Sequence, residues 1–246
     1  MNLRYFPRRA RKLWQLFPVS VYRRGLKFGV AAAVEHVGAM RSMPAATVID
    51  VGANIGQFSL MTRGIHPHAM IHAFEPLQAM ADTYAKLFRD DKRVALHRYA
   101  AGSSASTSEL NVSKQPDSSS MLPISDQQST LFPGTEKAGV EQVRVERIDD
   151  VLNVAALAEP ILVKLDVQGF ELEALKGMPK VLERARWVYL EASFTSLYVG
   201  QPLGNEIVVW LNRNGFELTG VYNPSYSPEG TNVQTDLLFT RAAASG

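Results

Sequence analysis

The stretch Asp50-Val-Gly-Ala-Asn-Ile-Gly56 decides the fold, because it places a glycine-containing turn between a strand and a helix. The β-branched run Thr47-Val-Ile-Asp-Val51 leads into this turn and is typical of a short buried strand. Gly52 and Gly56 let the backbone turn sharply and let a ligand approach it closely, and Asn54 tolerates left-handed dihedral angles. We therefore expect a ligand to bind at this turn.

Two common nucleotide-binding signatures do not fit the turn. The dinucleotide fingerprint needs glycine at its first, third and sixth places, and counting from Gly52 the last two hold Asn54 and Gln57. No Gly-Lys-Ser/Thr follows, so the Walker phosphate loop is excluded as well. A nicotinamide-dependent reductase is therefore disfavoured.

Short apolar runs alternate with helical segments along most of the chain. The strand-like runs are Thr47–Val51, Ala69–Phe74, Val94–Tyr99, Ile161–Leu165 and Trp187–Leu190. Helical patterns at Leu77–Arg89 and Glu171–Arg184 fill the gaps, which predicts parallel strands covered on both faces. Phe216–Tyr222 and Gln234–Arg241 follow one another across a loop and predict an antiparallel pair. The fold class is therefore α/β, a doubly wound sheet with an antiparallel C-terminal strand.

The segment Ser113–Gly139 interrupts this alternation. It is rich in Ser, Pro, Gln and Asp, and extended runs flank it at Glu109–Val112 and Gln142–Val145. A loop of this length is usually a lid, a binding loop or disordered. Within it, Ser118-Ser-Ser-Met-Leu122 either lines an acceptor pocket or is a solvated low-complexity loop.

A carboxylate follows the second predicted strand, in Phe74-Glu-Pro76. In open α/β sheets, Glu75 at this place can reach the ribose hydroxyls of a ligand bound at the end of the first strand. Pro76 lacks an N–H group and fixes the direction in which the chain leaves the strand. The alternative is that Glu75 caps the following helix.

Three charged residues lie on, or end, two other predicted strands. Lys164 and Asp166 are two residues apart, so their side chains point to the same side and can pair. Asp166 falls at the carboxyl end of its strand, where ligands bind, and Glu191 ends the next strand in the same way. We expect Asp166 to be the catalytic base, with Lys164 orienting it and Glu191 as the next candidate. Glu171 is interpreted as a helix-terminal acid.

Metal binding is not favoured. Asp166 and Glu191 could hold Mg²⁺, but neither has a third ligand nearby in sequence. The chain has no cysteine, which excludes disulfides and thiolate ligands. The histidines show no ligand spacing, and surface or core roles are expected for His36, His66, His68, His72 and His97.

Together these motifs resemble the FkbM family of methyltransferases, from about residue 47 to 241. The resemblance rests on Asp50-Val-Gly-Ala-Asn-Ile-Gly56, Phe74-Glu-Pro76, Val163-Lys-Leu-Asp-Val-Gln-Gly-Phe-Glu171 with Leu175-Lys-Gly177, and Leu190-Glu191. It implies a class I methyltransferase fold of seven strands and S-adenosylmethionine as the methyl donor. It also implies methylation of a hydroxyl oxygen on a sugar, glycan or polyketide-type acceptor. The alternative is a non-catalytic scaffold or sensor that binds the same donor.

The resemblance also implies which residues bind the donor. They are Asp50, Gly52, Ala53, Asn54, Gly56, Glu75, Pro76 and Ala100. The chain departs from the family pattern at two places. Arg98 stands where the family often has asparagine, and Gln168 stands where it usually has glutamate.

The N-terminus differs in charge from the rest of the chain. Met1–Val34 carries eight basic residues and no acid, although the whole chain has 24 acidic residues. We predict a helical extension over residues 1–46 and a methyltransferase domain over residues 47–246. One apolar stripe at helical spacing supports the extension, formed by Tyr22, Leu26, Val30, Ala33 and Val37.

The basic segment is a solvated helix face, a peripheral contact with anionic membrane, or a collector of anionic substrate. Nucleic acid is disfavoured, because no base-reading module is present. No apolar run approaches the ~18 residues of a membrane span, and no signal-peptide pattern occurs. We therefore expect a cytoplasmic enzyme.

Overall fold

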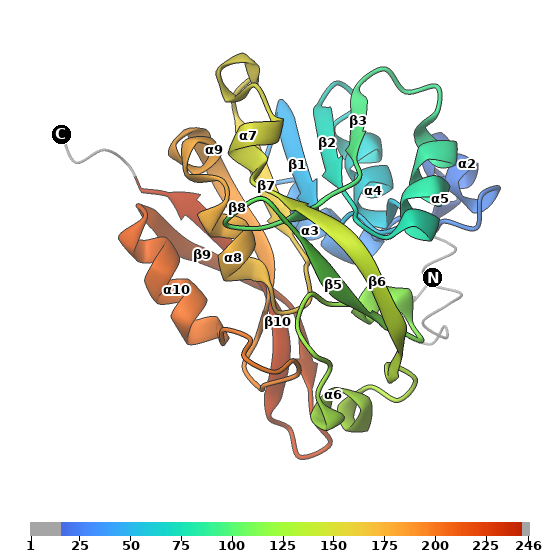
Figure 1. Cartoon of the computed structure of the whole chain (residues 1–246). Coiled ribbons are helices and arrows are strands. Elements are labelled where there is room, and N and C mark those ends of the chain that lie inside the picture. Colours follow the sequence, from blue (N-terminus) through green and yellow to red (C-terminus); the bar gives the residue numbers. More distant parts are fainter. Residues whose placement is uncertain (1–15, 243–246) are drawn as a thin grey trace, which may run out of the picture.

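A computed structural model describes residues 16–242 and contains a seven-stranded sheet of order β3-β2-β1-β7-β8-β10-β9 (Figure 1). Neighbours from β3 to β8 pair in parallel, whereas β10 is antiparallel to both β8 and β9. The strands are β1 (Thr47–Val51), β2 (Met70–Phe74), β3 (Val94–His97), β7 (Ile161–Leu165), β8 (Ala185–Ser193), β9 (Phe216–Tyr226) and β10 (Asn232–Arg241). The predicted α/β sheet with an antiparallel C-terminal strand is confirmed.

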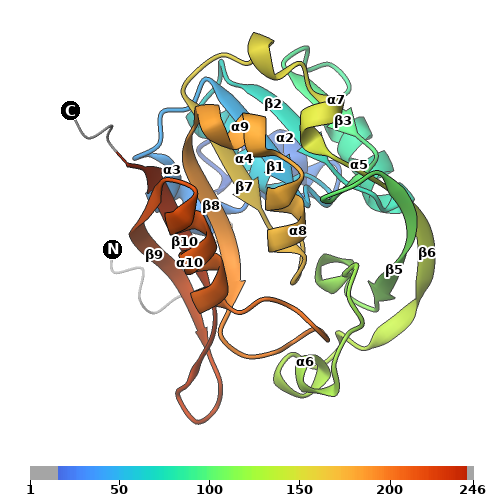
Figure 2. The same cartoon turned by 60° about the vertical axis from the view of Figure 1, so that its left-hand side comes forward.

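Helices cover both faces of this sheet (Figures 1 and 2). On one face lie α2 (Ser20–Leu26), α3 (Val37–Met40), α4 (Gln57–Ile65) and α5 (Gln78–Phe88). On the other lie α7 (Ile148–Val151), α8 (Glu171–Lys176), α9 (Pro179–Arg184) and α10 (Gly204–Arg213). Val48 packs with the first set and Ile49 with the second, because successive side chains of a strand point to opposite faces.

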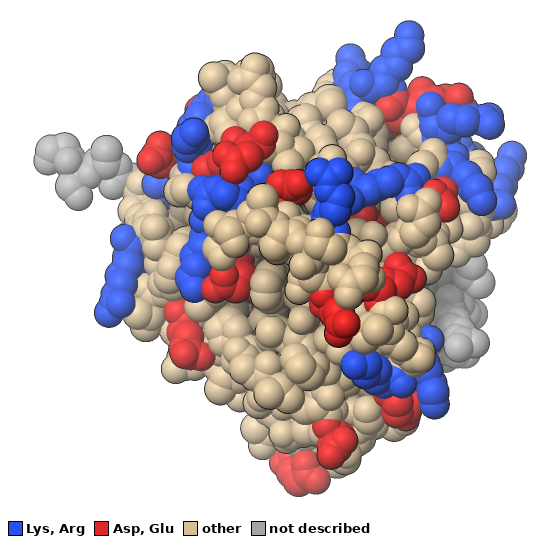
Figure 3. Space-filling model, viewed as in Figure 1, with Lys and Arg blue, Asp and Glu red and all other residues tan. Residues whose placement is uncertain are grey.

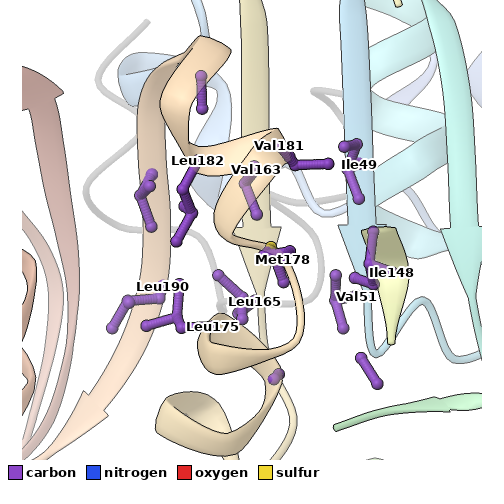
Figure 4. Close-up of a cluster of buried hydrophobic side chains, with 14 of the residues drawn as sticks. Ile49, Val51, Ile148, Val163, Leu165, Leu175, Met178, Val181, Leu182 and Leu190 are labelled. Atoms are coloured by element: carbon purple, nitrogen blue, oxygen red, sulfur yellow. The ribbon is translucent and has the colours of Figure 1, made fainter. Parts of the chain in front are cut away.

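The central strands are buried along their whole length. Every residue of β1 and of β7 is buried, as expected for parallel strands between two helical layers. Figure 4 shows Val163 and Leu165 of β7 facing Leu175, Met178 and Val181 of the helical layer. This packing fixes the positions at which β1 and β7 end.

The helix predicted over residues 171–184 is in fact two helices. Gly177 follows α8, and a Cβ on this residue would lie 2.1 Å from the carbonyl oxygen of Gly102. Pro179 then begins α9 at a position where proline is favoured. The continuous prediction was wrong because it gave too little weight to glycine and proline within an apolar helical pattern.

The described part of the N-terminal segment contains several short helices. α2 ends at Leu26, Gly29 takes a φ of +73°, and the chain then forms η2 (Val34–His36) before α3. Residues of this segment share a hydrophobic cluster with the central strands, and the cluster includes Tyr22, Val30, Met40, Val48 and Ile71. Residues 16–46 therefore share a core with the sheet, and the domain division at residue 47 stays a prediction. The part of the extension before residue 16 lies outside the described residues.

A second, three-stranded sheet of order β4-β6-β5 rises beside the first (Figure 2). Its strands are β4 (Ala100–Ala101), β5 (Ser106–Ser113) and β6 (Lys137–Glu146), so the two predicted extended runs are confirmed. The segment between β5 and β6 contains η3 (Pro116–Ser118) and α6 (Asp126–Leu131). A hydrogen bond of 2.6 Å from Ser120 Oγ to the carbonyl of Gln168 links the segment between β5 and β6 to the loop after β7.

Charged side chains are mixed on the face shown in Figure 3, where Lys and Arg alternate with Asp and Glu. Within residues 16–242, no helix is long and apolar enough to cross a membrane.

Candidate active site

A cavity lies where the chain connections diverge on either side of β1. From β1 the chain passes to β2 on one side, and later returns to β7 on the other. Such a switch point leaves a crevice at the carboxyl ends of the strands, where ligands bind in open α/β sheets. The cavity here has a volume of about 350 Å³ and is lined by residues that follow β1, β2 and β7.

The turn after β1 depends on Gly52. Its φ is +77°, and a Cβ at this residue would lie 1.9 Å from the carbonyl oxygen of Asp166. Asn54 takes a φ of +49°, which confirms the left-handed conformation expected there. Gly52, Ala53 and Asn54 line the cavity. Glycine thus allows the loops after β1 and β7 to meet beneath the ligand site.

Glu75 is buried at the end of β2 and lines the cavity beside Pro76. Its carboxylate accepts hydrogen bonds from the backbone N–H groups of Asn54 and Leu77, both at 2.8 Å. Burial raises the pKa of Glu75 to about 7, although those two bonds and the Lys164 charge act in the opposite direction. Glu75 therefore braces the turn that leads into α5 and also faces the cavity, and its contact with a ribose stays a prediction.

One end of the cavity is mostly apolar. It is formed around the start of the second sheet by Phe74, Leu77, Tyr99, Ala100, Ala101, Leu110 and Met121. Such a surface suits a flat aromatic ring. Arg98 lies outside the cavity and pairs with Asp82 at 2.8 Å.

Lys164 lines the cavity and is buried beneath the turn after β1. Its Nζ lies 3.2 Å from Asp50 Oδ1 and 3.8 Å from Asp166 Oδ2, and donates to the carbonyl of Gly52 at 3.1 Å. Burial alone would lower the pKa of Lys164, but Asp50 and Asp166 outweigh it and raise the pKa above its usual value. Lys164 and Asp166 thus lie close together as expected, although Asp50 is the nearer partner.

Asp166 is linked to Glu191 through Gln168. The Nε2 of Gln168 donates to Asp166 Oδ1 at 2.7 Å and to Glu191 Oε2 at 3.0 Å. Its Oε1 accepts from the Tyr198 hydroxyl at 2.7 Å. Asp166 and Gln168 line the cavity, whereas Glu191 lies behind them. A neutral amide therefore bridges the two carboxylates proposed for the chemistry.

Glu191 differs from Asp166 in its environment. Burial and the charges of Asp166, Asp236 and Glu171 raise the pKa of Glu191 well above its usual value. Its Oε2 also accepts a hydrogen bond from Gln234 at 2.9 Å. These neighbours favour the protonated form, so Glu191 suits an acid better than a base.

Two residues implied as donor ligands lie behind the cavity wall. Asp50 is fully buried, where its Oδ2 accepts from Ser59 Oγ at 2.6 Å and its Oδ1 faces Lys164. Gly56 precedes α4, and a Cβ there would press on Tyr84 and Phe88. Both residues shape the site from outside, whereas Ala100 lines it directly.

Glu171 begins α8 as a helix-terminal acid, as interpreted from the sequence. Its Oε1 accepts from the N–H groups of Val167 and Gly169, at 3.3 and 3.1 Å. Burial raises its pKa to about 7, with Asp166 acting in the same direction and the backbone hydrogen bonds opposing. Glu171 thus braces the loop that carries Asp166 and Gln168.

Sequence reasoning missed a polar cluster formed by His36, Tyr189, Asn223 and Asp236. His36 lines the cavity beside Phe58, and its Nδ1 lies 3.2 Å from Asp236 Oδ2. One signal was available, since Asp236 is the one acid of a strand-like run and directly precedes its apolar residues Leu237–Phe239. The same signal drew attention to Lys164.

No group of three His, Cys, Asp or Glu side chains within residues 16–242 is placed to hold a metal ion. The two carboxylates considered for Mg²⁺, Asp166 and Glu191, are instead bridged by the Gln168 amide.

The strand order, the reversed C-terminal strand and a cavity at the ends of β1, β2 and β7 define a class I methyltransferase fold. The chain belongs to the FkbM methyltransferase family, because the model of the methyltransferase FkbM domain matches residues 50–218. The class of reaction is therefore methyl transfer.

Named relatives support this assignment. The chain is 27% identical to methyltransferase sdnD of Sordaria araneosa over 197 residues, which span 70% of this chain and 74% of that protein. It is 25% identical to 2-O-methyltransferase NoeI of Sinorhizobium fredii, over 64% of this chain and 68% of that protein. It is 24% identical to 31-O-demethyl-FK506 methyltransferase FkbM of Streptomyces tacrolimicus, over 77% and 79%.

Proposed function

We propose that this chain transfers a methyl group from S-adenosylmethionine to a hydroxyl oxygen of a sugar, glycan or polyketide-type acceptor. The proposal depends mainly on one observation: Glu75, which follows β2, and Asp166, which follows β7, line the same cavity. The printed names of two relatives, a 2-O-methyltransferase and a 31-O-demethyl-FK506 methyltransferase, support oxygen as the accepting atom.

The residues that line the cavity have the chemical groups needed to bind S-adenosylmethionine. Glu75 offers a buried carboxylate to the two ribose hydroxyls, and the apolar end beside Ala100 accepts the adenine ring. Pro76 follows Glu75 in the chain, and the N–H of Asn54 donates to the Glu75 carboxylate, so both residues lie beside the proposed ribose position. Gly52 and Ala53 bring the backbone close to the centre of the cavity.

When bound, S-adenosylmethionine supplies a methyl group already activated by a positively charged sulfur. The protein therefore has to align the acceptor and remove a proton from its hydroxyl. Alignment can contribute ~7–11 kcal/mol. Asp166 is the proposed base, because it lines the cavity and two partners, Lys164 and Gln168, fix its carboxylate. Proton removal by a placed base contributes roughly 10²–10⁴-fold in rate.

The experiment is a turnover assay with purified protein, S-adenosylmethionine and a panel of glycan and polyketide alcohols. We expect formation of S-adenosylhomocysteine that depends on one class of alcohol and persists in the presence of a chelator. Loss of activity on chelation would instead assign a metal to the site. Binding of the donor without turnover on any alcohol would favour a non-catalytic scaffold or sensor.

A further inference from the structure

The cavity has a polar end beyond the family-matched residues, where His36 of η2 lines its wall. The Nδ1 of His36 lies 2.9 Å from the Tyr189 hydroxyl and 3.2 Å from Asp236 Oδ2. The rings of Phe58 and Tyr189 meet the imidazole edge-on, with centroids 5.6 and 5.7 Å away. One ring nitrogen is thus committed to the protein, and the ring is fixed from several sides.

Asp236 of β10 lies against His36. It is buried, and its Oδ2 accepts from the Tyr189 hydroxyl at 2.9 Å and from Asn223 Nδ2 at 2.7 Å. A buried carboxylate is costly without a counter-charge. Nδ1 of His36 faces this carboxylate, so the imidazole contacts the protein through Nδ1 and keeps Nε2 as its second hydrogen-bonding nitrogen.

Positive charge is scarce in the wall of the cavity. Among its described lining residues, Lys164 is the only lysine or arginine and His36 the only histidine, against the acids Glu35, Glu75, Asp117 and Asp166. The ammonium group of Lys164 has three hydrogens and three partners, the side chains of Asp50 and Asp166 and the carbonyl of Gly52. Of these two side chains, His36 is therefore the one with a nitrogen left for an anionic group.

The backbone favours negative charge at the same end. α4 begins at Gln57, and both Gln57 and Phe58 line the cavity. The first N–H groups of a helix have no partner within the helix and attract anions. His36 and Lys164 lie against the same Phe58 ring, which places both at this end.

We infer that His36, held by Asp236 and Tyr189, binds the carboxylate at the amino-acid end of S-adenosylmethionine. The inference rests on the proposed function, because it assumes that the cavity holds this donor. The nucleoside end then lies at Glu75 and the amino-acid end at His36, with Asp166 left for the acceptor. The segment before the family-matched residues thus supplies a donor-binding side chain.

The test compares two ligands by calorimetry on the full chain. S-adenosylhomocysteine has the amino-acid end, whereas 5′-methylthioadenosine keeps the nucleoside and sulfur but lacks it. We expect His36→Asn to weaken S-adenosylhomocysteine by about 10-fold to 150-fold, the loss of one charge-assisted hydrogen bond. Binding of methylthioadenosine should stay as in the unsubstituted protein, which also reports an intact nucleoside site.

Two further variants test the partner of His36 and provide a control. Asp236→Asn keeps the shape of the cluster and removes its charge, so it should weaken S-adenosylhomocysteine in the same selective way. His68→Asn changes an exposed histidine outside the cavity, and should alter the affinity of neither ligand.

Unchanged binding of S-adenosylhomocysteine to His36→Asn would overturn the inference, including the case in which turnover alone is lost. An equal loss of both ligands would also overturn it, because His36 would then only support the shape of the cavity. If the unsubstituted protein binds neither ligand, the proposed function itself fails.

Discussion

At the scale of single residues, the carboxylate of Asp166 is held by one cationic and one neutral side chain. Lys164 lies near one carboxylate oxygen, and the neutral amide of Gln168 donates to the other. Glu191 shares that amide but has a raised pKa, caused first by burial, which favours its protonated form. Glu191 is therefore the weaker candidate for the base, and Asp166 remains the proposed one.

We predict that Asp166→Asn lowers turnover by ~10²-fold or more while donor affinity changes little, because the shape is kept and the base is lost. Steady-state kinetics and a binding titration on the same preparation check both parts. Asp90→Asn, on an exposed acid outside the cavity, is the matched control. Near-normal turnover would exclude Asp166 as the base. A loss explained wholly by weaker donor binding would assign Asp166 to the donor pocket and leave Glu191 as the next candidate.

Glu171 predicts a pH dependence of stability. Its pKa is raised by burial from 4.5 to about 7, so the folded state holds this proton more tightly than the unfolded state. The stability that Glu171 contributes is thus present at low pH and lost as pH rises through about 7. The shift corresponds to roughly 2–3 kcal/mol between pH ~5 and ~7.5.

Urea unfolding of Glu171→Gln and of the unsubstituted protein at these two pH values measures the effect. The glutamine keeps an acceptor for the N–H groups of Val167 and Gly169 but does not ionise. We expect the variant to lose less stability between the two pH values than the unsubstituted protein. An identical loss in both proteins would show that Glu171 does not titrate in this range.

At the scale of elements, the sequence predicted the buried strands better than the connections between them. β1 and β7 match their predicted bounds because their short runs of mostly apolar residues, several of them β-branched, leave few alternatives. β5 and β6 were recognised only as extended runs, since most of their residues are exposed or half-buried and their pattern does not specify a partner. Their assembly with β4 into a wall of the cavity depends on tertiary contacts.

The residues of the candidate site also divide into those that the sequence predicted and those that it did not. Glu75 and Asp166 follow predicted strands, so strand order alone brings them to one edge. His36 and Asp236 are far apart in sequence and meet only because η2 packs against the sheet near β8 and β10. No local pattern could predict that contact.

A further prediction concerns the effect of Gly52, in the turn after β1, on the stability of the protein. Gly52→Ala should lower stability by roughly 3 kcal/mol or more, because its Cβ would overlap the Asp166 carbonyl as well as strain the backbone. Gly200→Ala is the matched control, with a φ of +79° and no atom within 4 Å of the added Cβ. The control should lose only about 1–2 kcal/mol, the penalty of a left-handed conformation. Equal losses by urea unfolding would show that the overlap at Gly52 is relieved at no cost.

At the scale of the whole molecule, the chain combines a methyltransferase fold with a strongly basic start. Eight basic residues lie within Met1–Val34 without an acid, and Trp14 and Phe17 lie among them. In the described part, Phe17 is largely exposed. This composition suits a surface of anionic lipid.

We predict that the full chain associates reversibly with vesicles containing anionic lipid, and that salt releases it by screening the attraction. Co-sedimentation at low and high ionic strength checks this, with neutral vesicles as the control. Equal recovery in the supernatant with either vesicle would leave the basic segment as a solvated surface.

The central claim is that the cavity at the ends of β1, β2 and β7 binds S-adenosylmethionine through Glu75. Calorimetric titration with S-adenosylhomocysteine tests it most directly, using NAD as the comparison ligand and Glu75→Ala as the variant. We predict binding of S-adenosylhomocysteine, far weaker or no binding of NAD, and a loss of roughly 10-fold to 150-fold in the variant. Circular dichroism should show that the variant keeps its fold. An affinity unchanged in a folded Glu75→Ala protein, or no binding of S-adenosylhomocysteine at all, would contradict the account.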